Sequence, residues 1–205
     1  MKLYVITIFS LLAMIICFSA CSPKSCVDAS YHFTMNENFL PEKDSIRVGD
    51  TLWMNSSHST TFIDLSSNKS VDFSNSLLGS NIRILQFPEA STNVSGAVNN
   101  FIIVKIFGRE IGNDNIPAEN KGFYFEEINS NYTLKLGFVA KQKGIYVISV
   151  GNSLGVVQNN QGCSKADVEI NNNNNNNHLY FYQNFFPGST ISDYTRTHVY
   201  CFKVY

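Results

Sequence analysis

The strongest constraint on the fold is the hydrophobic pattern of the chain after residue 30. Short apolar or alternating runs recur between clusters of Asn, Gly, Ser and Pro, and no long stretch shows the 3.6-residue period of an amphipathic helix. This pattern is typical of an all-β domain. The strands that it predicts cover residues 31–35, 45–48, 51–55, 61–65, 101–107, 122–126, 132–140, 144–150, 166–170, 178–182 and 198–204.

The strand at 132–140 has the clearest alternation. One of its faces carries four large apolar side chains: Tyr132, Leu134, Leu136 and Phe138. Because Asn tolerates a positive φ, the Asn-Ser-Asn sequence at 129–131 predicts a hairpin turn before this strand. We expect strands 122–126, 132–140 and 144–150 to form a meander. Strand 101–107 is nearly all apolar, which predicts a mid-sheet position with both faces covered.

Two segments are predicted to be loops. Residues 66–100 are rich in Ser and Asn, and 77–78 and 82–87 could form a short helix or strand within them. Residues 171–177 are all asparagine, which we expect to be a solvated hairpin insertion. We find no internal repeat and no domain linker. The sequence therefore predicts a single antiparallel β-sandwich with long polar loops over residues 31–205, with a small subdomain after Gly162 as an alternative.

Two segments resemble parts of a known family. Residues 45–58, which read SIRVGDTLWMNSSH, resemble the early strand pair of the cupredoxins, and KGIYVISV at 143–150 resembles the strand before their copper-binding cysteine. Both pieces are also common in immunoglobulin-like sandwiches. The resemblance implies an Ig-like or cupredoxin-like fold. It does not extend to copper, because Val150 stands where the cysteine is expected and His58 alone cannot complete the ligand set.

Tyr146 has a structural interpretation. It enters its strand in a Gly-x-Tyr sequence, a pattern in which the hydroxyl of a tyrosine corner ties a loop to the sandwich. We therefore expect Tyr146 to stabilise the fold and to have no part in chemistry.

The sequence offers no recognisable catalytic centre. It contains no Gly-x-Ser-x-Gly elbow, no His-Glu-x-x-His motif and no Gly-Lys-Ser/Thr phosphate loop. We interpret all four histidines as structural residues: His32, His58, His178 and His198. The expectation is a protein that is not an enzyme, with no catalytic residue, no metal site and no cofactor.

An aromatic cluster just after the asparagine run is the best indication of a binding site. Its members are Tyr180, Tyr182, Phe185 and Phe186. Exposed aromatic side chains can stack on sugars or anchor a protein partner. In the alternative interpretation, alternate residues fill the core and the others cap a sheet edge.

Residues 1–20 have the order of a secretory signal peptide. A positive charge at Lys2 precedes the apolar run 3–16, and the small pair Ser19-Ala20 leads directly into Cys21. Cleavage by an ordinary signal peptidase would release a soluble secreted protein. An uncleaved membrane anchor is a further alternative, since the apolar stretch is close to the minimum length for a membrane span.

The small residues before Cys21 resemble the lipobox of bacterial lipoproteins. This resemblance implies that 1–20 is removed, that acyl chains such as palmitate are attached to Cys21, and that residues 21–30 form a polar tether. The lipid would then anchor the protein to the membrane, because burial of the acyl chains in the bilayer provides the binding free energy.

The charge of the chain argues against nucleic acid as a partner. The formal net charge of −1 becomes −2 when the signal peptide and its Lys2 are removed. Nucleic-acid binding requires clustered Lys and Arg, and this near balance does not provide them.

Three cysteines remain if Cys17 leaves with the signal peptide and Cys21 carries lipid. An oxidising compartment permits one disulfide among them. We favour Cys163 with Cys201 over a bond to Cys26, because both lie in the C-terminal part of the chain. In the alternative, all three thiols are reduced and packed.

Together these features predict a cell-envelope lipoprotein, anchored at the outer membrane or cell surface, or a secreted protein if Cys21 is not acylated. Its expected role is a non-catalytic surface binding or adhesion module with a glycan or protein partner. The alternative is a structural accessory subunit of an envelope protein complex.

Overall fold

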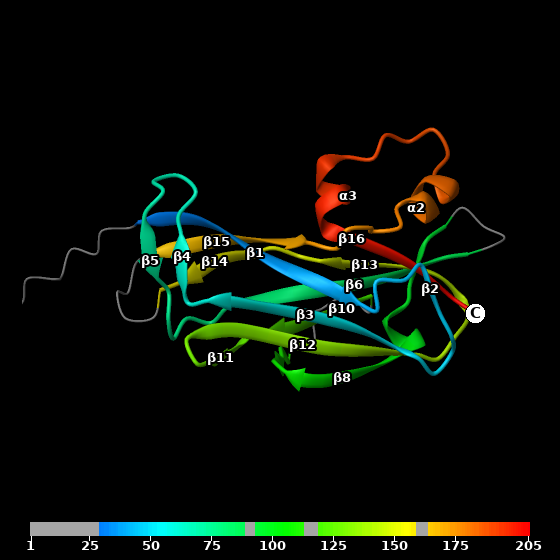
Figure 1. Cartoon of the computed structure of the whole chain (residues 1–205), viewed down its shortest axis with the longest axis horizontal. Helices are drawn as coiled ribbons and strands as arrows, with labels where there is room; N and C mark the ends of the chain where they lie inside the picture. The colour runs from blue at the N-terminus through cyan, green and yellow to red at the C-terminus, as the bar shows by residue number, and fades with distance from the viewer. Residues whose placement is uncertain (1–28, 89–92, 113–118, 159–163) are drawn as a thin grey trace, which may run out of the picture.

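The computed structural model describes residues 29–88, 93–112, 119–158 and 164–205. These residues form two stacked sheets with a small hairpin at one end and a helical cap on one side (Figure 1). The arrangement confirms the predicted all-β sandwich. The predicted signal peptide, Cys21 and almost all of the predicted tether lie outside the described residues.

Sheet A has the strand order β11–β12–β3–β1–β15–β14, and β8 also pairs with β12. Its strands pair antiparallel, except that β1 and β15 run parallel. The strands are β1 (Ser30–Leu40), β3 (Thr51–Ser59), β8 (Phe101–Phe107), β11 (Glu126–Ile128), β12 (Asn131–Ala140), β14 (Ser153–Val157) and β15 (Lys165–Asn172).

Sheet B has the strand order β2–β16–β13–β6–β10–β9, and β7 also pairs with β6. Here β2 and β16 are the parallel pair. The strands are β2 (Ser45–Ile46), β6 (Gly79–Phe87), β7 (Ser95–Gly96), β9 (Arg109–Glu110), β10 (Asn120–Tyr124), β13 (Gly144–Val150) and β16 (Val199–Val204). Outside both sheets lie the hairpin of β4 (Thr61–Ile63) and β5 (Ser70–Asp72) and the 3-10 turn Val98–Asn100.

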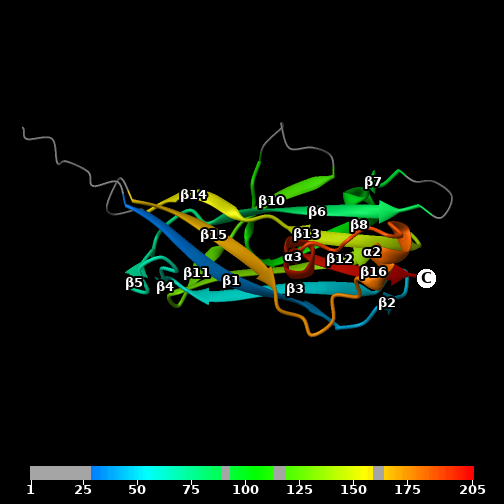
Figure 2. The ribbon, with the colours of Figure 1, turned by 90° about the horizontal axis from the view of Figure 1, so that it is seen from above.

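The core lies between the sheets because strands such as β3 and β12 direct their buried apolar side chains to one face. The alternation predicted for β12 is confirmed, since Tyr132, Leu134, Leu136 and Phe138 are all at most 2% exposed. Figure 2 shows the strands of the two sheets crossing the length of the molecule. Facing residues from sheet B include Ile82, Ile84, Ile148, Tyr200 and Phe202.

Strand β13 has both faces covered, whereas β8 does not. Among the described strands, β8 pairs only with β12, and its Ile102 and Ile106 are 55% and 48% exposed, so the predicted mid-sheet position was wrong. In β13, Ile148 points into the core while Val147 packs in a second apolar cluster on the outer side of sheet B. Both strands have apolar sequences, but only β13 is buried on both faces, because a second apolar layer covers its outer side.

The predicted meander was also wrong, because β12 lies in sheet A and β13 in sheet B. The chain crosses between the sheets at residues 141–143 instead of pairing the two strands. The predicted hairpin turn before β12 is confirmed, since Asn129 and Ser130 have φ of 50° and 60°. Two consecutive positive φ values match the twist of a two-residue hairpin loop.

The predicted loop at 66–100 contains the long strand β6. Ser80, Ile82 and Ile84 alternate toward the core, so residues 82–87 form a strand and not a helix. The polar residues Asn81 and Arg83 on the alternate positions made this segment resemble a loop. Strand β6 pairs with β13 along one edge and with β10 and β7 along the other.

The asparagine run is not a solvated hairpin insertion. Its first two residues end β15, and the rest leads from sheet A to the cap. The Asn174 amide forms two 2.7 Å hydrogen bonds with the backbone of Phe39, accepting from its N–H and donating to its C=O. Asn177 donates to the carbonyl of Arg196 at 2.7 Å. The amide side chains thus replace backbone partners along a path without regular structure.

Tyr146 forms the predicted corner. Its hydroxyl donates to the carbonyl of Gln142 at 3.0 Å and lies 3.2 Å from the amide nitrogen of Asn100. The ring is fully buried, so these bonds connect the crossing at 141–143 to the core.

Glu37 is a carboxylic acid inside the core. It lies on β1 between Ser56 of β3 and Asn172 of β15, and all three side chains are at most 8% exposed. Neither of its carboxyl oxygens has a hydrogen-bond partner among the described residues. Burial raises the pKa of Glu37 well above its usual value of 4.5, so the acid is neutral in the fold over a wider pH range than in the unfolded chain.

The protein should therefore lose stability as the pH rises. Folded Glu37 keeps its proton where the unfolded chain has lost it, so the free energy of unfolding falls by up to about 1.4 kcal/mol per pH unit until folded Glu37 ionises. The substitution Glu37→Gln, neutral at every pH, should remove this slope. Denaturant unfolding of both proteins from about pH 5 to pH 8 measures it. Equal slopes for the two proteins would contradict the assignment.

Candidate binding sites

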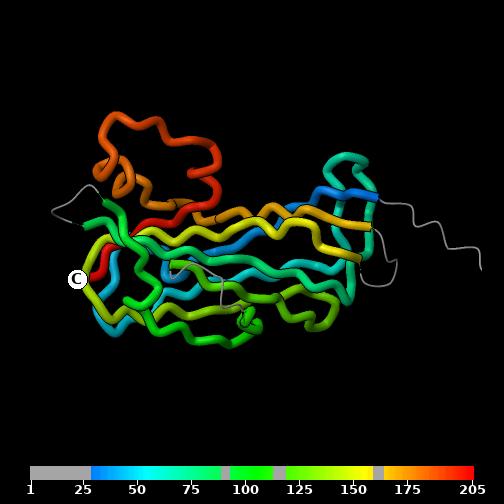
Figure 3. Tube along the Cα trace, turned by 180° about the vertical axis from the view of Figure 1, so that it is seen from behind, coloured from blue at the N-terminus to red at the C-terminus, as the bar shows by residue number. Residues whose placement is uncertain are grey.

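A cap of two short helices covers the outer face of sheet B. The helices are α2 (Tyr180–Phe185) and α3 (Asp193–His198), and Figures 1 and 3 show both on the same side of the sandwich, next to β16. Sheet B needs this cover because Phe87, Val147 and Val199 point away from the core. The cap side chains packed against them are Leu179, Phe181, Tyr182, Phe185 and Phe186.

The predicted strand at 178–182 was wrong, because most of this segment belongs to the start of α2. Tyr182, Phe185 and Phe186 are three and four residues apart, a spacing that places them on one side of a helix. A single helical turn can therefore bring all three rings onto Phe87. Tertiary packing against that ring overrides the strand preference of aromatic residues.

The four aromatics predicted to bind a ligand separate into two groups. Phe185 stacks on Phe87 with ring centroids 4.5 Å apart, and Phe186 meets the same ring edge-on at 5.8 Å. Tyr182 meets it edge-on at 6.0 Å. Tyr180 is 42% exposed and donates to Asp44 at 2.9 Å. Three of the four rings thus pack on the outer face of sheet B, whereas the alternative interpretation expected core filling and capping of a sheet edge.

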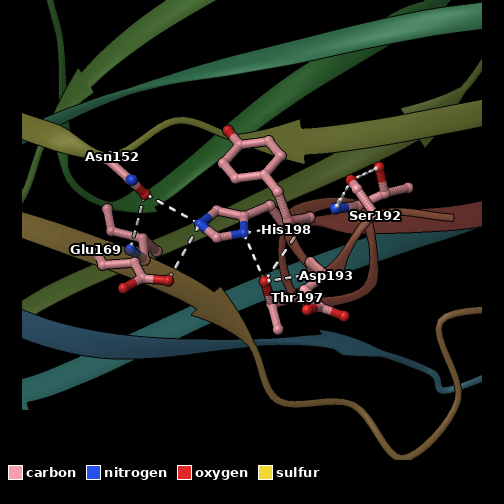
Figure 4. A network of polar contacts seen from close by, with 9 residues as sticks. Asn152, Glu169, Ser192, Asp193, Thr197 and His198 are labelled. Carbon is pink, nitrogen blue, oxygen red and sulfur yellow. Dashed lines mark hydrogen bonds and ion pairs between the residues drawn. The ribbon is translucent and has the colours of Figure 1, made fainter.

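A polar network fixes α3 to the rest of the molecule (Figure 4). His198 is 2% exposed, and its Nε2 lies 3.2 Å from the Asn152 side-chain oxygen and 3.8 Å from a Glu169 carboxylate oxygen. Its Nδ1 contacts the carbonyl of Tyr194 at 3.0 Å. Ser192 begins the helix by accepting from the N–H of Thr195. These contacts explain His198 as an internal connector between the cap and β15.

Cys201 is a free, fully buried thiol under the cap. The disulfide favoured from the sequence is therefore not formed by Cys201 in this structure, and its proposed partner Cys163 lies outside the described residues. Burial raises the pKa of the Cys201 thiol to about 12, which leaves it protonated and unreactive at neutral pH.

A cleft lies between β14, at the edge of sheet A, and the neighbouring strands β6 and β10 of sheet B. It has a volume of about 880 Å³. Its walls carry exposed apolar side chains, with Leu154 73% and Leu77 67% exposed. The hydrogen bond from Gly151 N–H to the Asn81 carbonyl, 2.8 Å long, holds the crossing between the sheets at this position.

The electrostatic character of this cleft is neutral. Among the described residues, its lining has no charged side chain, and its polar groups are amides, hydroxyls and backbone. Gln158 is 7% exposed and donates to the carbonyl of Asp72, while its side-chain oxygen has no partner among the described residues. Such a lining suits an uncharged ligand with apolar surface and hydrogen-bonding groups.

Sequence reasoning missed this cleft. Strand β14 was not predicted, and residues 77–78 were noted only as a possible element within a loop. The cleft is formed by segments far apart in the chain, so only the exposed apolar residues Leu77 and Leu154 could have indicated it, and only once their exposure was known.

Comparison with known proteins supplies no family. No family model and no curated protein matches the chain. Among solved structures, the human F-spondin reeler domain is similar at 12% identity, with a TM-score of 0.34 over 73% of this chain and 94% of that one. The second type II cohesin module from the cellulosomal adaptor ScaA scaffoldin of Acetivibrio cellulolyticus is similar at 12% identity, with a TM-score of 0.28 over 70% of this chain and 95% of that one.

Within the described ranges, no group of three or more His, Cys, Asp or Glu is placed to hold a metal ion. In the same part of the chain, no helix has the length and apolar character required to cross a bilayer.

Proposed function

We propose that this chain is a non-catalytic lipoprotein of the cell envelope whose sandwich binds an uncharged ligand in the cleft beside β14. The neutral, partly apolar lining of that cleft is the observation that carries the proposal. We assign the protein no catalytic residue, no metal and no cofactor, and nucleic acid is not among its proposed partners.

The position of the cleft relative to the chain start supports this role. Lys165 of β15 pairs with Ser30 on one side and with Val157 on the other. The entry of the tether into β1 is therefore only about 10 Å from the cleft strand β14. A ligand held there would lie at the end of the sandwich that the proposed tether enters, so we propose a component of the envelope itself.

The cleft is tested by cosedimentation of the purified mature protein with insoluble polysaccharide from the envelope. We expect binding that Leu154→Asp weakens by at least about tenfold, since it places a charge in an uncharged cleft. Ile63→Asp is the matched control, because Ile63 is 50% exposed on β4, outside the cleft lining. Absence of binding by the unaltered protein, or equal losses in both variants, would contradict the proposal.

The alternative role as an accessory subunit of an envelope complex is supported by the edge strand β8. Ile102, Ile106 and Phe107 are 38–55% exposed there, and apolar edge strands favour pairing with another chain. When whole envelope fragments replace the polysaccharide in the cosedimentation experiment, retention through a second envelope protein would favour this alternative if Ile106→Lys abolishes it and Leu154→Asp does not.

The lipid anchor is tested at Cys21. Mass spectrometry of the mature N-terminus should find residue 21 first and carrying acyl chains, and Cys21→Ser should shift the protein from the membrane fraction to the soluble fraction. An unmodified N-terminus on protein recovered from the medium would instead identify a secreted protein.

A further inference from the structure

The single tryptophan of the chain lies on the outer face of sheet A. Trp53 of β3 is paired with Gly137 of β12, and its six-membered ring covers that glycine. A Cβ atom added to Gly137 would lie 2.8 Å from Trp53 Cζ3 and 3.0 Å from Cη2. The absence of a side chain at Gly137 therefore lets the indole lie against the backbone of the next strand.

A hollow of about 500 Å³ borders the same tryptophan. Its lining combines two aromatic rings with charged and hydroxyl groups, including Lys43, Arg47, Asp50, Thr51, Trp53 and Tyr205. Lys135 lies 5.6 Å from the indole centroid, but neither Lys135 nor Gly137 lines the hollow. Trp53 therefore lines the hollow in addition to its contacts with Gly137 and Lys135.

The backbone around the hollow is held by hydrogen bonds within the protein. The Asp50 carboxylate accepts from the N–H of Arg47 at 2.9 Å, and the Asp50 N–H donates to the Arg47 carbonyl at 3.0 Å. Gly49 donates to the Ala140 carbonyl at 2.8 Å, which fixes this turn to β12. A ligand would therefore meet a site that is already formed, with little ordering to be done on binding.

We propose that this hollow is a saccharide-binding subsite in which a pyranose ring stacks on Trp53. The C–H face of a sugar matches the apolar indole, and its hydroxyls match a mixture of donors and acceptors. Lys43 and Arg47 donate, Asp50 accepts, and Thr51 does either. An apolar peptide fits less well, because it would remove three charged groups from water without hydrogen-bonding them.

The subsite lies at the opposite end of the sandwich from the tether. Trp53 pairs with Leu40, the last residue of β1, about 33 Å along the strand from Ser30. It is therefore separate from the cleft beside β14 and faces a ligand farther from the anchored end. The inference does not rest on the cleft, because the two sites share no lining residue.

Fluorescence tests this assignment directly, because Trp53 is the only tryptophan. The purified mature protein is titrated with three defined probes, hexasaccharides of β-1,4-linked glucose, β-1,4-linked N-acetylglucosamine and α-1,6-linked mannose. We expect at least one of them to shift the Trp53 emission to shorter wavelength and to reduce its quenching by acrylamide about twofold or more, as a stacked sugar excludes water from the ring.

Arg47→Ala should weaken this response by about tenfold in affinity while keeping the Trp53 reporter. Lys141→Ala is the matched control, since Lys141 is an exposed cation outside the hollow. Leu154→Asp should leave the response intact even where it abolishes polysaccharide binding at the cleft. No change of Trp53 emission with any probe, or equal losses in Arg47→Ala and Lys141→Ala, would overturn the assignment.

Discussion

The pairing of β1 within sheet A determines where everything else in this molecule lies. From Ser30 to Glu37 the strand runs parallel to β15, and from Glu37 to Leu40 it pairs antiparallel with β3. Its inward side chains, among them Phe33, are part of the core. The strand therefore spans the sandwich, with the end of the proposed tether and the cleft at its start and the tryptophan hollow at its end. Both proposed sites depend on this register.

Two features show how the fold accommodates groups that a simple sandwich would exclude. Part of the outer face of sheet B is apolar, so the cap buries Phe87 and its neighbours, and most of the aromatics that first suggested a binding site serve this purpose. Glu37 is buried beside Ser56 and Asn172. Burial at this position costs less free energy for the neutral acid than for the ionised carboxylate.

The sequence predicted what depends on local pattern and missed what depends on distant partners. The alternation of β12 and the Asn129-Ser130 turn are local signals, and both were confirmed. No local signal states which sheet a strand joins, so β12 and β13 were paired wrongly. The first residues of α2, including Tyr182, were assigned to a strand because their packing against Phe87, far away in the chain, leaves no local signal. Trp53 lies within the cupredoxin-like segment, but its position over Gly137 could not be predicted without knowing the pairing register of β3 and β12.

The central claim is that ligands bind at the two ends of the sandwich while the cap only supports sheet B. It is tested most directly by amide chemical-shift mapping of the protein during titration with solubilised envelope polysaccharide. The account predicts shifts at Leu154 and Gln158 in the cleft and at Thr51 and Trp53 beside the hollow, with the amides of α2 unchanged. Shifts confined to α2 and α3, with none at those four residues, would contradict it.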